Sequence, residues 1–153
     1  MSRVQLALRV SDLEGSIAFY SKLFGVEPAK LRPGYANFAI DEPALKLVLL
    51  EGEPGQPTVM DHLGVEVFST DEVTAATTRL ADAGLITRTE DDTTCCYAVQ
   101  DKVWVHGPGD EPWEVYTVKA DANQLAPDTA CCATPADGEL LTVGSAGSGC
   151  ACG

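Results

Sequence analysis

Two six-residue stretches decide the fold, QLALRV at residues 5–10 and HLGVEV at residues 62–67. They lie 57 residues apart (62 − 5 = 57), and in both of them apolar residues alternate with polar or very small ones. Because successive side chains of a strand point to opposite faces, this alternation predicts two strands with matching faces. One face is apolar, and the other begins with Gln5 or His62. The sequence therefore predicts an internal repeat whose two strands, side by side, form a cleft with a candidate ligand on each.

A helical pattern follows each of these strands. The first helix is predicted to start at residues 11–14, with Ser11 as the capping residue, and to end at Gly25; the second is predicted at 69–83 and ends at Gly84. The apolar face of each strand is expected to pack on the helix that follows it. Each module thus reads strand–helix–strand–strand, with a further strand expected. The additional strands are predicted at 35–40, 44–50, 85–89, 96–104 and 113–118.

Composition and charge exclude several classes of protein. The chain has 153 residues, of which 45% are hydrophobic, as in an ordinary globular domain. A net charge of −13 argues against nucleic acid as a partner. The chain contains no run of about 18 apolar residues and no signal-peptide core, so we expect a cytosolic protein with no membrane partner. Its six cysteines are then expected to be thiols rather than a disulfide framework.

The composition changes near residue 120. Residues 120–153 are rich in Ala, Gly, Asp, Thr and Pro without sustained periodicity, which predicts a flexible, cysteine-containing tail. The folded domain is therefore predicted to span 1–119, with module one at 1–51 and module two at 59–119.

A third candidate ligand lies on the last predicted strand. Glu114 stands between Trp113 and Val115, and a carboxylate among apolar neighbours needs a partner. Taken singly, Glu114 can be an exposed strand carboxylate, Gln5 polar surface and His62 a hydrogen-bonded imidazole. Taken together on one cavity face, two oxygen donors and one imidazole suit a divalent first-row metal. Three protein ligands leave coordination positions open, as expected for a catalytic site.

Vicinal cysteines are the second chemical signal. Adjacent side chains of a regular strand point to opposite faces, so Cys95 and Cys96 can act together only in an irregular segment. Residues 91–94 are predicted to form a loop just before them. Two thiolates brought together capture soft centres such as trivalent arsenic or cadmium. The alternative is one buried and one exposed cysteine without function.

Further segments carry a resemblance to a known family, namely VSDL at 10–13, FY at 19–20, LFG at 23–25 and PWEVY at 112–116. With the repeated strands and helices, residues 2–119 resemble the vicinal oxygen chelate superfamily, which includes glyoxalases, extradiol dioxygenases and antibiotic-resistance proteins. The resemblance implies an α+β fold in which two βαβββ modules form an open, barrel-like metal cleft. It also implies a metal on Gln5, His62 and Glu114, although many members have histidine where this chain has Gln5.

Within that superfamily, TTCCYA at 93–98 and KVWV at 102–105 resemble the organoarsenical carbon–arsenic lyases. The resemblance implies an Fe(II)-dependent dioxygenase, with O₂ as co-substrate, that converts methylarsenite and aromatic arsenicals to arsenite and so detoxifies them. Cys95 and Cys96 would then bind the arsenic. The tail cysteines would either capture arsenical or form an inert, metal-sequestering tail; they are Cys131, Cys132, Cys150 and Cys152.

Three further predictions concern the cavity. Tyr116 shares the face of Glu114 and either lines the cavity or packs in the core. His106 is either a loop residue or a proton relay. Arg9 and Glu66 occupy corresponding positions of the repeat and are expected to pair with each other.

Three classes of function remain open from the sequence. The first is the lyase, acting on a small-molecule organoarsenical. The second is a non-enzymatic protein that sequesters arsenicals or cadmium through its thiols without needing iron. The third is another metal-dependent enzyme of the superfamily, such as a ring-cleaving dioxygenase or a glutathione-conjugate transferase, whose activity would be indifferent to Cys95 and Cys96. The sequence is compatible with a monomer or a homodimer.

Overall fold

The computed structural model describes residues 2–123, which form one eight-stranded sheet and two helices. The first half of the chain contributes β1 (Arg3–Val10), α1 (Leu13–Phe24), β2 (Lys30–Arg32), β3 (Tyr35–Ile40) and β4 (Leu45–Glu51). The second half contributes β5 (Val59–Glu66), α2 (Thr70–Asp82), β6 (Arg88–Cys95), β7 (Ala98–His106) and β8 (Pro112–Asp121). Both halves have the order strand–helix–strand–strand–strand, which confirms the predicted pair of βαβββ modules.

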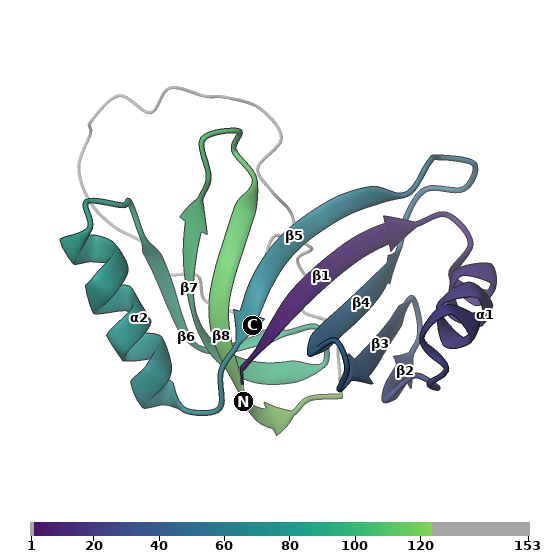
Figure 1. The fold of residues 1–153 in the computed structure, drawn as a ribbon, viewed down its shortest axis with the longest axis horizontal. Coiled ribbons are helices and arrows are strands. Elements are labelled where there is room, and N and C mark those ends of the chain that lie inside the picture. Colours follow the sequence, from purple (N-terminus) through teal and green to yellow (C-terminus); the bar gives the residue numbers. More distant parts are fainter. Residues whose placement is uncertain (1, 124–153) are drawn as a thin grey trace.

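The two modules join through their first strands. The sheet order is β2-β3-β4-β1-β5-β8-β7-β6, and β1 pairs with β5 in antiparallel fashion. Leu6 lies opposite Leu63 in this pair, and the same two residues are repeat partners (63 − 6 = 57). A pseudo-twofold axis therefore passes beside Leu6 and Leu63. The sheet curls into an open half-barrel with β1 and β5 at its middle (Figure 1).

Both helices start close to the predicted positions. Asp12, one residue after the predicted cap Ser11, accepts a hydrogen bond from the backbone N–H of Gly15 at 2.8 Å and caps α1. Asp12 takes this role because Leu13 is the first helical residue, and the cap is the residue just before it. Gly25 ends the helix with a positive φ of 66°, as predicted.

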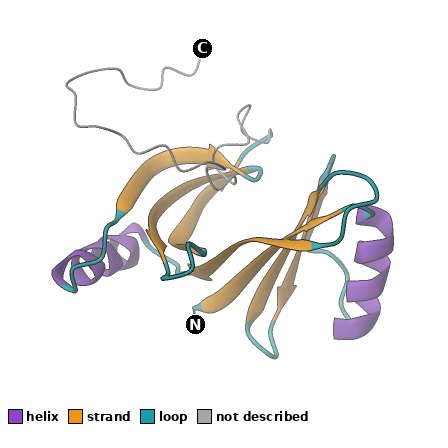
Figure 2. Cartoon of the chain, turned by 90° about the horizontal axis from the view of Figure 1, so that it is seen from above, coloured by secondary structure: helices purple, strands orange, loops and turns teal. Residues whose placement is uncertain are grey.

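Each helix covers the outer face of its own module (Figure 2). The core under α1 includes the apolar side chains of the first repeat stretch, which are Leu6, Leu8 and Val10. The core under α2 includes Val67, Val103 and Val115. With the apolar faces turned outward to the helices, the concave face of the sheet carries Gln5 and His62. Neither helix of the described residues is long and apolar enough to cross a lipid bilayer.

The β6–β7 hairpin differs from the predicted strands at 85–89 and 96–104. The loop prediction for 91–94 is wrong, because this segment continues β6 through a bulge. Asp101 on β7 holds the bulge, since its carboxylate accepts the backbone N–H of Asp92 at 2.9 Å. A polar segment can thus stay in the sheet when a neighbouring strand satisfies its backbone.

Candidate metal and thiol site

Gln5, His62 and Glu114 meet at the middle of the concave face. They come from β1, β5 and β8, which are neighbours in the sheet. Gln5 Nε2 lies 3.0 Å from His62 Nε2 and 2.7 Å from Glu114 Oε1. His62 Nε2 lies 3.4 Å from Glu114 Oε1, and all three residues are buried. The structure therefore brings the three predicted metal ligands together.

Gly64 makes room for this approach. It lies opposite Gln5 in one strand pair and opposite Glu114 in the other. A Cβ added to Gly64 would lie 3.1 Å from Glu114 Cγ and 3.3 Å from Gln5 Cβ, closer than ordinary van der Waals contact. The very small residue in the second repeat stretch is therefore what lets the two donors face each other.

The donor set fits a divalent cation. With metal–ligand distances of about 2.1 Å, neighbouring donors of an octahedral site lie about 3 Å apart. The three observed separations, 2.7, 3.0 and 3.4 Å, are close to that value, although two of them are measured from Gln5 Nε2, whose place the amide oxygen would have to take. Among the described residues, no three His, Cys, Asp or Glu side chains are arranged for a metal, so a site here depends on the amide of Gln5.

Tyr116 supports both orientations of the Gln5 amide. Its hydroxyl donates to Gln5 Oε1, while the amide nitrogen faces His62 and Glu114. A half-turn of the amide presents the oxygen to a cation, and the hydroxyl then accepts from the nitrogen, because a phenol both donates and accepts. Burial, with the carboxylates of Glu66 and Glu114, raises the pKa of Tyr116 well above its usual value, so the hydroxyl keeps its proton.

Asp61 fixes the ring of His62. Its Oδ1 lies 2.6 Å from His62 Nδ1, and its Oδ2 lies 2.5 Å from Arg9 Nε. With Nδ1 held by this carboxylate, Nε2 faces the cavity. Histidines that bind metals commonly have a carboxylate in this position. Burial lowers the pKa of His62, but Asp61 and Glu114 outweigh it and raise the pKa to about 9. A cation bound at Nε2 displaces this proton.

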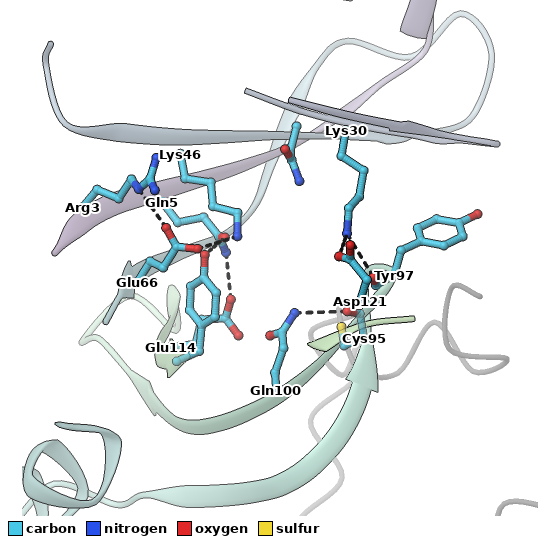
Figure 3. Close-up of polar contacts among 12 residues, drawn as sticks. Arg3, Gln5, Lys30, Lys46, Glu66, Cys95, Tyr97, Gln100, Glu114 and Asp121 are labelled. Atoms are coloured by element: carbon cyan, nitrogen blue, oxygen red, sulfur yellow. Dashed lines mark hydrogen bonds and ion pairs between the residues drawn. The ribbon is translucent and has the colours of Figure 1, made fainter. Parts of the chain in front are cut away.

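The predicted pair of Arg9 and Glu66 is wrong. Glu66 pairs instead with Arg3 and Lys46, each at 2.9 Å (Figure 3). Because β1 and β5 run in opposite directions, Arg3 lies opposite Glu66 and Arg9 lies opposite Val59. Equivalent positions of the repeat meet only close to the pseudo-twofold axis.

Lys102 is a buried partner that the sequence did not single out. Its Nζ lies 2.7 Å from Glu114 Oε2, and each of the two residues is 2% exposed. Burial raises the pKa of Glu114, but Lys102 and His62 outweigh it and lower the pKa to about 2. The ammonium keeps this carboxylate ionised and holds one oxygen, so that the other faces Gln5 and His62. A lysine directly before the apolar residues 103–105 of a strand was the available signal, but it did not identify the partner.

Cys95 and Cys96 lie together at the tip of the β6–β7 hairpin. Cys95 ends β6 and is buried, Cys96 begins a two-residue turn, and their Sγ atoms lie 3.5 Å apart. Cys96 has a positive φ of 52°, and Tyr97 has one of 61°. This turn breaks the alternation of the strand, which allows two adjacent side chains to act on one side. The irregular segment is therefore the turn itself.

The first module holds this turn in place. Lys30 Nζ donates to the backbone carbonyl of Tyr97 at 3.2 Å and also binds Asp121 (Figure 3). The hydroxyl of Tyr97 donates to the carbonyl of Pro33 at 3.0 Å, and its ring lies 5.5 Å from that of Tyr35. The position of the thiols therefore depends on both modules.

One cavity of about 210 Å³ joins the two sets of residues. Its lining includes Gln5, His62, Glu114, Cys95 and Cys96. A group bound to the thiols is therefore in the same cavity as a cation bound to the three donors.

The remaining predictions about the cavity have different outcomes. Tyr116 is buried behind Gln5 and is not among the residues that line the cavity. His106 is exposed at the end of β7 and does not line the cavity either. The tail cysteines lie outside the described residues; they are Cys131, Cys132, Cys150 and Cys152.

Comparisons with known proteins extend these observations. A family model described as Glyoxalase/Bleomycin resistance protein/Dioxygenase superfamily matches residues 3–115. A trivalent organoarsenical cleaving enzyme of Thermomonospora curvata is 65% identical over 150 residues, which cover 97% of this chain and 95% of that protein. The cadmium-induced protein CadI of Mycobacterium tuberculosis (strain ATCC 25618 / H37Rv) is 65% identical over 122 residues, 80% of each protein. The structure of an extradiol ring-cleaving dioxygenase from B. fuscum matches with a TM-score of 0.58 and 20% identity, over 82% of this chain and 35% of that one, which is a likeness of fold.

Proposed function

The chain belongs to the glyoxalase, bleomycin resistance protein and dioxygenase superfamily, and on that premise we propose that it is an Fe(II)-dependent dioxygenase that cleaves the carbon–arsenic bond of trivalent organoarsenicals. The observation that carries the proposal is the presence of two adjacent thiols and three metal donors in one cavity. The 65% identity to a trivalent organoarsenical cleaving enzyme supports the substrate class. We infer that methylarsenite and aromatic arsenicals are substrates, that O₂ is the co-substrate, and that release of arsenite serves detoxification.

Cys95 and Cys96 bind the arsenic in this proposal. Each thiol replaces one hydroxyl of the hydrated organoarsenical, so that one sulfur–arsenic bond forms and one water leaves, with no change in oxidation state. Sulfur bonds to soft centres of about 2.3 Å can bridge two sulfurs that lie 3.5 Å apart. The organic group remains as the third substituent on arsenic and occupies the cavity.

Gln5, His62 and Glu114 would hold the ferrous iron through two oxygen atoms and one imidazole nitrogen. Iron held there supplies, with O₂, the redox chemistry that breaks the carbon–arsenic bond. The part of the protein is positioning, because Asp61 orients His62 and Lys102 keeps Glu114 ionised.

The proposal requires reduced thiols. Cys95 and Cys96 are not joined in a disulfide in the structure. Because thiols are kept reduced in the cytosol, we infer that the protein acts there.

Sequestration is the second candidate function. It uses the same two sulfurs, 3.5 Å apart, without the metal donors. The 65% identity to a cadmium-induced protein favours it. A sequestering protein would bind an arsenical or cadmium and release no product.

The test measures arsenite release from methylarsenite. Iron-free protein is loaded anaerobically with Fe(II), given methylarsenite and then exposed to air, beside samples that lack iron or oxygen. The lyase requires arsenite only when both are present, whereas methylarsenite that stays bound and unchanged would support sequestration.

Thiol variants examine the first step separately. Cys95→Ser and Cys96→Ser should each abolish arsenite release and leave Fe(II) binding close to that of the wild type, because no iron donor comes from the hairpin turn. Full turnover in either variant would rule out the dithiolate.

A further inference from the structure

Gln100 carries a buried hydrogen-bond acceptor without a partner among the described residues. The residue is 5% exposed and lies on β7. Its Nε2 donates to the backbone carbonyl of Cys95 at 3.1 Å, whereas no donor reaches its Oε1. Buried acceptors are nearly always satisfied in folded proteins, so this oxygen indicates a missing donor.

The orientation of this amide is determined by its neighbour. A backbone carbonyl only accepts hydrogen bonds, so the amide nitrogen of Gln100 has to face Cys95 and the oxygen has to face away. Gln100 and Lys102 are two residues apart on β7 and both line the cavity. Figure 3 shows Gln100 between Glu114 and Cys95, with its nitrogen turned to Cys95. The acceptor without a partner therefore lies on the side of the amide away from Cys95, and the protein atoms packed around it have to shift before a donor in the cavity can reach it.

We propose that Gln100 is a specificity-determining residue that accepts a hydrogen bond from an amino or hydroxyl group on the ring of an aromatic arsenical. The inference rests on the proposed function, because it places the arsenic on Cys95 and Cys96. Once both thiols have replaced hydroxyls, the arsenic keeps none, and the donor has to come from the organic group. A methyl group offers no donor, whereas a substituted aromatic ring does.

The size of the cavity allows such a ring. The cavity measures about 210 Å³. A cavity of roughly 150 Å³ in another protein holds benzene, so a phenyl group with one small polar substituent fits here. One neutral hydrogen bond to the buried acceptor should improve affinity about tenfold over a ring without the donor.

The test measures binding to iron-free protein, so that it does not depend on turnover. Phenylarsonous acid and its 3-amino and 4-amino derivatives are titrated by calorimetry, in the presence of a competing monothiol, into the wild type and Gln100→Met. One amino derivative should bind the wild type about tenfold more tightly than the parent, and Gln100→Met should remove this preference. The quantity to compare is the affinity of the amino derivative divided by that of the parent, in the wild type and in Gln100→Met. Any effect of the substitution on the thiol turn, or of the amino group on arsenic itself, cancels when one of these ratios is divided by the other.

Asn37→Ala is the matched control. Asn37 lines the same cavity, but its amide already donates to the hydroxyl of Tyr35 at 2.8 Å, so the preference should survive. The proposal is overturned if the wild type shows no preference for either isomer, if Gln100→Met retains it, if Asn37→Ala also removes it, or if the arylarsenicals do not bind. A wild type that shows the preference but releases no arsenite with iron and O₂ would refute the lyase and leave the role of Gln100 in place.

Discussion

Asp61→Asn tests whether the carboxylate behind His62 controls the affinity of the metal site. Asp61 Oδ1 lies 2.6 Å from His62 Nδ1, its Oδ2 lies 2.5 Å from Arg9 Nε, and its side chain is 4% exposed. Asparagine has nearly the same size but no charge. Its amide nitrogen then faces either Arg9 or the Nδ1–H of His62, so that one donor opposes another.

The expected loss follows from these contacts. A hydrogen bond to a charged group contributes about 1.5–3 kcal/mol, and about 1.4 kcal/mol is a factor of ten in affinity. Affinity for Fe(II) should therefore fall about 10- to 100-fold, as expected when the partner of a metal-bound histidine is changed. The side chain of Arg9 is 30% exposed, so water screens its ion pair with Asp61, and the loss of that pair adds less to the effect than the loss of the contact with His62.

Competition with a chromophoric chelator, carried out anaerobically on iron-free protein, measures this affinity, and urea unfolding reports stability separately. Glu66→Gln is the matched control, because it is also a carboxylate-to-amide change at a buried, ion-paired position of β5, where the partners are Arg3 and Lys46. Asp61→Asn should weaken Fe(II) binding far more than the control does. Equal losses in the two variants would assign the effect to net charge, and wild-type affinity in Asp61→Asn would refute orientation by this carboxylate.

Three further perturbations test other contacts of the site and fold. Gly64→Ala should weaken Fe(II) binding in the same titration, because the new Cβ would lie 3.1 Å from Glu114 Cγ; unchanged affinity would contradict the role of this glycine. Lys102→Met should lower the free energy of urea unfolding by about 3–5 kcal/mol, because the buried carboxylate of Glu114 loses the ammonium that neutralises its Oε2. Adding Glu114→Gln should recover most of that loss, and a double variant as unstable as the single one would point to packing instead. Burial raises the pKa of Asp101, but hydrogen bonds and Lys119 outweigh burial and lower the pKa below 3.8. The ionised carboxylate of Asp101 therefore stabilises the fold above pH 3.8, and this contribution is lost as the pH falls further. Unfolding of Asp101→Asn should therefore depend less on pH in acid, and a wild-type profile would show that Asp101 does not contribute.

Much of the fold was predictable because its signals are local. Alternation in 5–10 and 62–67 identified the two central strands and the faces that pack on the helices. The bulge in β6 was not predictable from its own residues, because Asp101 on β7 satisfies the backbone of Asp92. A polar segment that looks like a loop in isolation is a strand when its neighbour supplies an acceptor.

The candidate site was predictable as a list of residues but not as an arrangement. Gln5, His62 and Glu114 stood out by residue type and position. Lys102 and Gln100 did not, because a polar residue in a strand shows its importance only through burial and a partner. Their partners, Glu114 Oε2 and the Cys95 carbonyl, lie on another strand or across a turn.

The sequence by itself determined which side chains share a face, since that depends only on the two-residue period of a strand. Tertiary structure decided which of them meet. Antiparallel pairing centred on Leu6 and Leu63 places Gln5 Nε2 3.0 Å from His62 Nε2, because both lie next to the axis. The same pairing places Arg9 and Glu66 at opposite ends of the strands, although the repeat aligns them. Period is a property of one backbone, whereas register and direction are set when the two modules pack against each other.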